Sequence, residues 1–100
     1  MPLEIIWSAK AKSTYFKVLD QILKKWTLKE VQKFDSETNK HLALISSFPE
    51  MCSLIKRKSN IYRCVITSQT SVYYKIRNNK IYLITFWDNR QSSSKLRLIK

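Results

Sequence analysis

Glycine is absent from all 100 residues of the chain. Glycine is the residue that adopts positive φ freely and lets a backbone approach a phosphate closely, so its absence excludes a glycine-rich phosphate-binding loop. The only histidine is His41, and the only cysteines are Cys52 and Cys64. These three side chains cannot supply a four-ligand zinc site, and we therefore predict neither a metal nor a cofactor.

Long apolar segments are also missing. No stretch approaches the roughly 20 apolar residues that span a membrane, so we expect no membrane contact. The first residues carry Glu4 and no apolar run of signal-peptide length. We therefore predict a cytoplasmic location, where the thiols of Cys52 and Cys64 would both be reduced.

Acidic residues are nearly absent from the second half of the chain. Residues 51–100 contain six lysines and all five arginines but a single acid, Asp88, whereas residues 1–50 balance eight lysines against six acids. The formal net charge of +12 is thus concentrated in one half of the molecule. Such an asymmetry indicates a polyanionic or acidic protein partner.

The length of the chain predicts a single domain over residues 1–100. Its hydrophobic residues recur with the periods of helices and strands. Leu3–Trp7 is a short apolar run typical of a strand, and Ser8 can cap a following helix. Apolar residues then recur at helical spacing as far as Trp26. Thr27 and Glu30 have the spacing of a capping box for a second helix, which should end ahead of Pro49.

Beyond Pro49 the hydrophobic period changes from helical to alternating. The alternation predicts strands over 61–67, 71–77 and 80–88, with a fourth strand or edge over 54–58. Asn78 and Asn79 suit a tight hairpin turn, because asparagine tolerates positive φ. We therefore predict an α+β fold, in which an N-terminal strand and a helical hairpin precede a three- to four-stranded antiparallel sheet whose far face is rich in cations.

Four large aromatic residues are expected to pack in the core, namely Trp7, Trp26, Phe34 and Tyr74. Tyr73 and Trp87 are different, because alternation along their strands can place both on the outer face of the sheet. There they could stack on bases or contact a protein partner.

The chain resembles the RelE/ParE superfamily of toxins from bacterial type II toxin–antitoxin, or plasmid-stabilisation, systems. The resemblance spans nearly the whole chain and rests on the order and spacing of Trp7-Ser8-Ala9, Trp26, Phe34, Pro49, Tyr62-Arg63, Tyr73-Tyr74-Lys75-Ile76 and Asp88-Asn89-Arg90. It implies a compact α+β toxin that is neutralised by a cognate antitoxin covering its basic surface. RelE-type members cut mRNA on the ribosome, whereas ParE-type members inhibit DNA gyrase and have no nuclease centre.

The resemblance to RelE-type enzymes implies that cations of the open sheet face would stabilise the charge that develops during RNA cleavage. Arg63, Arg90 and Lys56 match family positions, and Lys58 lies close enough in sequence to substitute for a missing lysine. RelE-type enzymes also use a C-terminal Tyr or His, but only Leu96 stands near the corresponding position. This departure favours the ParE-type function.

Three functions therefore stay open: a ParE-like gyrase inhibitor, a ribosome-dependent RelE-like mRNA endonuclease, and a non-toxic basic module that binds RNA or protein. In each of them we expect the partner to occupy a surface formed by Arg63, Lys75, Tyr73, Trp87 and Arg90. Each residue also has a purely structural explanation. Asp88 and Arg90, for example, can simply form an ion pair at the strand end, which is the interpretation that we favour for Asp88.

Overall fold

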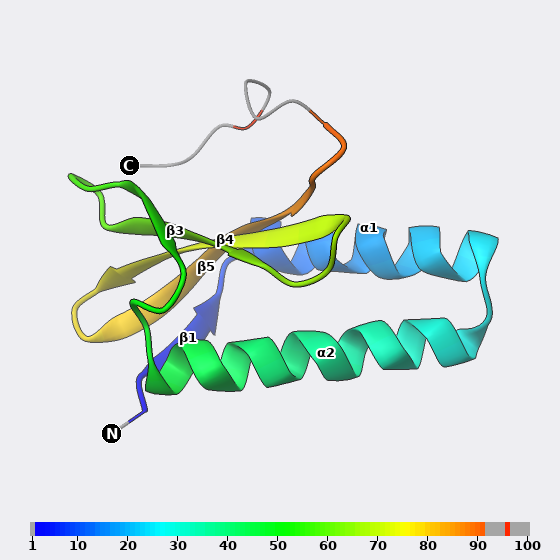
Figure 1. Ribbon diagram of the computed structural model, residues 1–100, viewed down its shortest axis with the longest axis horizontal. Coiled ribbons are helices and arrows are strands. Elements are labelled where there is room, and N and C mark those ends of the chain that lie inside the picture. The colour runs from blue at the N-terminus through cyan, green and yellow to red at the C-terminus, as the bar shows by residue number, and fades with distance from the viewer. Residues whose placement is uncertain (1, 92–95, 97–100) are drawn as a thin grey trace.

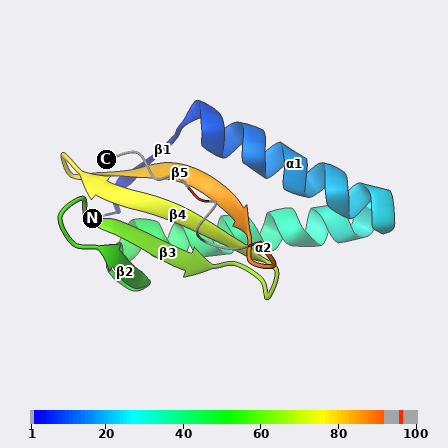
Figure 2. The same ribbon diagram turned by 90° about the horizontal axis from the view of Figure 1, so that it is seen from above.

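The fold has two layers, a helical hairpin and a five-stranded sheet (Figure 1). A computed structural model describes residues 2–91 and 96. The elements are β1 (Glu4–Trp7), α1 (Ala9–Lys25), α2 (Leu28–Ser47), β2 (Ser53–Lys56), β3 (Ile61–Val65), β4 (Thr70–Arg77) and β5 (Lys80–Asp88). Both helices lie against one face of the sheet, and no helix of the described residues covers its other face (Figure 2). The predicted α+β class and element order are confirmed.

The sheet has more strands than the sequence predicted, because β1 joins it. The strand order is β1-β5-β4-β3-β2, and β1 is the one strand of the described sheet that runs parallel to its neighbour. Ile5 lies opposite Ile81, so the peptide groups of β1 find hydrogen-bond partners on an edge of β5 that would otherwise be open. An alternating pattern identifies a strand but does not say which edge that strand will join.

The turn between β4 and β5 is formed by two asparagines, as predicted. Asn78 and Asn79 have φ of 53° and 61°, and Arg77 lies opposite Lys80. Two central residues with positive φ form the hairpin turn whose twist matches that of the flanking strands. In this glycine-free chain, asparagine therefore takes the role that glycine often has.

The two helices begin differently. The Ser8 Oγ accepts a hydrogen bond from the backbone N–H of Ala11 at 2.9 Å, which confirms the predicted N-cap of α1. Thr27 is the N-cap of α2, but its side chain makes no capping hydrogen bond, so the predicted capping box with Glu30 is wrong. The backbone N–H of Glu30 instead donates to the Thr27 carbonyl oxygen at 3.0 Å. This local turn starts the helix without the hydroxyl.

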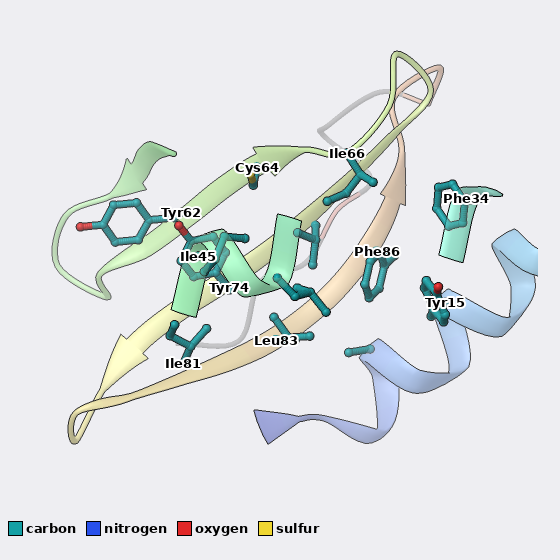
Figure 3. Packing of buried hydrophobic residues seen from close by; sticks show 13 residues of the cluster. Tyr15, Phe34, Ile45, Tyr62, Cys64, Ile66, Tyr74, Ile81, Leu83 and Phe86 are labelled. Atoms are coloured by element: carbon teal, nitrogen blue, oxygen red, sulfur yellow. The ribbon is translucent and has the colours of Figure 1, made fainter. Parts of the chain in front are cut away.

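The main core lies between the sheet and the helices, and aromatic rings gather in the part of it next to α1 (Figure 3). The ring of Tyr15 on α1 contacts those of Trp7, Phe34 and Phe86, with centroid separations between 4.9 and 5.9 Å. Its hydroxyl donates a hydrogen bond to Asp35 on α2. Burial, and secondarily that hydrogen bond, raise the pKa of Tyr15 far above its ordinary value. Phe34 and Tyr74 are buried as predicted, and Trp7 packs against the cluster while partly exposed.

Trp26 is not a core residue, and the prediction that it would be is wrong. Its side chain is 65% exposed. The hairpin of α1 and α2 extends past the end of the sheet, and Trp26 lies at the turn between the helices (Figures 1 and 2). The apolar stripe of α1 therefore continues beyond the surface that it could cover.

Cys52 and Cys64 form a disulfide, which corrects the expectation of two reduced thiols. Pairing of Ser53 with Arg63 and of Leu54 with Tyr62 defines the antiparallel register of β2 and β3. One further step along that register places Cys52 opposite Cys64, with their Cα atoms 5.1 Å apart, a separation that a disulfide readily spans. In chain-entropy terms, closing a loop of this size stabilises a domain by roughly 3 kcal/mol.

The two N-caps provide a matched test of the cap of α1. Ser8→Ala removes the cap bond and also the 3.0 Å hydrogen bond that the hydroxyl donates to the Ile84 carbonyl oxygen. We expect the free energy of unfolding in urea to fall by about 1 kcal/mol or more. Thr27→Ala should have a clearly smaller effect because Thr27 makes no side-chain cap bond. Equal losses in the two variants would contradict the assigned cap.

Candidate functional site

The face of the sheet opposite α1 and α2 carries a second, smaller apolar cluster. Ile61, Tyr73 and Ile84 are buried there, and Trp87 and Leu96 pack against them. The register of β4 and β5 shifts between Tyr73 and Tyr74. This bulge lets Ile84 face outward with Tyr73, while the backbone N–H of Phe86 points to Thr14 of α1. We call this side of the sheet the outer face.

The bulge is held from the helical side by Thr14 of α1. Its Oγ1 accepts a 2.9 Å hydrogen bond from the backbone N–H of Phe86 and lies 3.4 Å from the Oγ1 of Thr85. A backbone N–H left without a strand partner by a bulge is costly to bury unless another group accepts from it. Thr14 thus stabilises the strand geometry that directs Ile84 and Trp87 to the outer face.

A cavity of about 560 Å³ lies on the outer face, and we refer to it as the outer cavity. Its described lining combines two cations with aromatic, amide and aliphatic groups: Ile55, Lys56, Arg63, Tyr73, Trp87, Asn89, Gln91 and Leu96. None of these described lining residues is acidic. The outer cavity therefore presents positive charge above an apolar floor, which suits an anionic or acidic group carried on a flat or apolar body.

Asn89 positions Arg63 within the outer cavity, a role that sequence reasoning missed. The Arg63 Nη2 donates to the Asn89 Oδ1 at 3.3 Å, and the hydroxyl of Ser71 donates to the same oxygen at 2.8 Å. The backbone N–H of Asn89 in turn donates to the Gln69 carbonyl oxygen at 2.8 Å. The sequence offered one signal for this role, a polar residue directly after a long strand, but nothing to say which side chain it would meet.

Four of the predicted site residues thus come together, namely Lys56, Arg63, Tyr73 and Trp87. Lys58 and Lys75 lie in a different hollow of about 330 Å³, which Arg77 also lines. Lys75 shares the outer face with Tyr73, since it is two residues further along β4. Its Nζ lies 6.0 Å from the centre of the Tyr82 ring. The outer face therefore carries two separate groups of cations.

Arg90 does not share the outer face with Arg63 and Lys75, and the expectation that it would is wrong. It lines a cavity of about 300 Å³ on the helical side, together with Trp26, Phe34 and Lys25. The carboxylate of Asp88 holds it there, because the Arg90 Nη2 donates to one oxygen at 2.8 Å and the Arg90 Nε donates to the other at 3.0 Å. The local ion pair predicted for Asp88 is confirmed.

This ion pair changes the acidity of Asp88. Its hydrogen bonds with the Arg90 side chain lower the pKa of Asp88 below the ordinary value, and partial burial opposes that effect. A carboxylate with a lowered pKa stabilises the folded state above its unfolded pKa, and that contribution is lost as the pH falls through the folded value.

A further surface of the molecule is apolar. Phe16, Leu19, Leu23 and Val31 line an open hollow of about 600 Å³ along the helical hairpin. Phe16 is 65% exposed, and Leu23 and Leu28 are also exposed. Exposed apolar side chains that are contiguous, rather than scattered, are typical of surfaces that bind another protein.

Over the part of the chain that the structure describes, no group of three or more His, Cys, Asp or Glu side chains is arranged to hold a metal ion. Among the same residues, neither helix is both long enough and apolar enough to cross a membrane.

The ion pair at the end of β5 can be tested by its pH dependence. We expect Asp88→Asn to lower the free energy of unfolding near neutral pH, and the difference from the unmodified chain to shrink as the pH falls to about 3. Urea unfolding at a series of pH values measures both effects. Asp20→Asn is the matched control, because Asp20 makes a longer and more exposed ion pair with Lys24. A difference that stays constant down to that pH would show that the Asp88 charge is not involved.

The comparison with curated proteins finds no match for this chain. A family described as the ParE toxin of type II toxin-antitoxin system, parDE, matches residues 5–92. The match begins in β1 and ends just beyond β5, so it includes both helices and every residue of the described strands except Glu4. The chain therefore belongs to the ParE toxin family of type II toxin–antitoxin systems, and this membership implies an antitoxin partner.

Proposed function

We propose that this toxin stops growth by binding DNA gyrase and that it has no nuclease centre of its own. The observation that carries the proposal is the separation of the cations that RNA cleavage would require. Lys56 and Arg63 line the outer cavity, and Lys58 lies with Lys75 in the separate hollow of about 330 Å³. Arg90 is paired with Asp88 on the helical side.

The chemistry of the outer cavity supports the same proposal. Cleavage of RNA without a metal needs a base for the 2′-hydroxyl, an acid for the leaving oxygen, and cations for the phosphorane. The outer cavity provides cations, but its described lining contains no carboxylate and no histidine. The resemblance to RelE-type enzymes implies that their C-terminal acid or base would fall near Leu96, which has neither function. Membership in the ParE family favours gyrase as the target.

The apolar surface of the helical hairpin gives independent support for a protein target. Phe16, Leu23 and Leu28 have large exposed side chains. Apolar contacts of this kind contribute to protein–protein interfaces, whereas a nucleic-acid backbone is bound mainly by cations. We therefore infer that a protein contacts the hairpin as well as the basic face of the sheet.

A RelE-like endonuclease is the second candidate, and one observation favours it. Lys56 and Arg63 lie in the same cavity as Tyr73 and Trp87, which is an arrangement of cations and aromatic rings that could hold an RNA segment. In this case Arg63 would contact the scissile phosphate, and Arg90 would not.

Purified toxin separates the two candidates. We expect it to block supercoiling of relaxed plasmid by gyrase and to leave translated mRNA intact in a reconstituted ribosomal reaction. Normal supercoiling at saturating toxin, combined with new 5′ ends in the mRNA, would support the endonuclease instead. The endonuclease further requires Arg63→Ala to reduce cleavage by about a hundredfold or more while Arg90→Ala, on the helical side, changes it little.

We also propose that the antitoxin neutralises the toxin by covering the outer face, where Arg63 and Lys75 present charge without an acidic partner among the described residues. Reversing both charges, with Arg63→Glu and Lys75→Glu, should weaken antitoxin binding by about tenfold or more, mostly through faster dissociation. Surface plasmon resonance at two salt concentrations measures the change.

The control for this experiment carries the same change in net charge elsewhere. Lys10→Glu and Lys40→Glu are exposed helical positions, one on each helix. If the two double variants lose affinity equally, antitoxin binding depends on overall charge and the proposed contact with the outer face is wrong.

A further inference from the structure

The disulfide connects the start of β2 to β3, and both strands contribute residues to the lining of the outer cavity. Cys52 directly precedes β2, Cys64 lies in β3, and β2 contributes Ile55 and Lys56 to the cavity lining. We propose that Cys52 and Cys64 form a reversible thiol–disulfide site that controls how firmly β2 is held on the sheet, and hence the position of Lys56 in the outer cavity.

The strand that the disulfide secures has few other attachments. β2 is the last strand in the sheet order, so it has a hydrogen-bonded neighbour on one side alone within the described sheet. All four of its residues are exposed, and its register with β3 shifts between Leu54 and Lys56. A short edge strand with an irregular ladder and little buried apolar area is among the first segments of a domain to open.

Opening of β2 need not disturb the rest of the fold. The hydroxyl of Tyr74 donates a 2.8 Å hydrogen bond to the carbonyl oxygen of Pro49, three residues ahead of Cys52. The rings of Tyr74 and Tyr62 stack at 5.4 Å, and Tyr74 is fully buried. These contacts hold the chain between α2 and Cys52 in the folded state, so we expect the local opening that follows reduction to stay within β2 and the loop that follows it.

The exposure of the two cysteines indicates which sulfur is attacked first in thiol–disulfide exchange. Cys64 is buried with 5% exposure and belongs to the main core, as Figure 3 shows, whereas Cys52 is only partly buried. A thiolate from a low-molecular-weight dithiol attacks the Cys52 sulfur, which breaks the bond between the two sulfurs and releases Cys64 as a thiolate that takes up a proton. The second thiolate of the dithiol then attacks its own mixed-disulfide sulfur, which frees Cys52 and leaves the reagent as a cyclic disulfide.

Oxidation reverses these steps with a low-molecular-weight disulfide, such as oxidised glutathione, as the oxidant. Two thiols of the protein are then oxidised, and the reagent is reduced to two thiols. A cellular shift in thiol–disulfide balance would thereby change the lining of the outer cavity without any change in sequence.

Hydrogen exchange of the whole chain tests the proposal. The protein is first equilibrated with oxidised glutathione or with dithiothreitol, and its thiols are counted by alkylation and intact mass. We expect no alkylated thiols in the first state and two in the second. We further expect amides of 53–56 to exchange about tenfold faster in the reduced state, whereas amides of β4 and β5, which open only with the whole domain, stay protected over the same exchange times.

In both reagents, the Cys52→Ser variant should show the hydrogen-exchange rates of the reduced state. The control variant Ser53→Ala, at the neighbouring position, should behave as the unmodified chain. Two alkylated thiols after equilibration with oxidised glutathione would overturn the proposal, as would equal exchange of 53–56 in the two redox states. Neither measurement uses gyrase or RNA, so failure here is distinct from failure of the proposed function.

Discussion

The packing of Tyr15 between the two helices and the sheet is the contact on which the other features of the molecule depend. Its ring contacts Trp7, Phe34 and Phe86, and its hydroxyl binds Asp35, so one side chain joins β1, α1, α2 and β5. Because apolar groups must be removed from water together, this cluster places both helices on the same face of the sheet. The opposite face is left to carry the basic residues.

This arrangement explains why the molecule offers two kinds of surface. Alternation along β3 sends Tyr62 and Cys64 into the core and therefore sends Arg63 to the outer face. The helices continue past the end of the sheet, so their apolar stripe becomes an exposed surface near Trp26. The basic sheet face and the apolar hairpin lie on opposite sides of the sheet, so a partner that covers both must be acidic in one part and apolar in another.

Much of the fold could be predicted from the sequence, because it depends on local patterns. The cap at Ser8, the end of α2 ahead of Pro49, and the Asn78–Asn79 turn each follow from the chemistry of a few neighbouring residues. The parallel pairing of β1 and the disulfide could not be predicted, since both depend on which strands become neighbours. The exposure of Trp26 depends on how long the helices are relative to the sheet, and the spacing of apolar residues does not indicate that relative length.

Part of the candidate site could also be predicted from the sequence, because alternation along a strand is a local pattern. Lys56 and Arg63 meet because β2 and β3 are adjacent antiparallel strands. The last residue of β5, Asp88, and the two residues that follow it behave differently. Asn89 turns to the outer face and binds Arg63, whereas Arg90 turns to the helical side and binds Asp88. Once a chain leaves a strand, alternation no longer dictates the direction of its side chains, and hydrogen bonds decide it instead. The end of β5 thus divides adjacent polar residues between two faces of the sheet. A toxin that binds protein through both faces can use that division. A nuclease cannot, because it needs its cations around one phosphate.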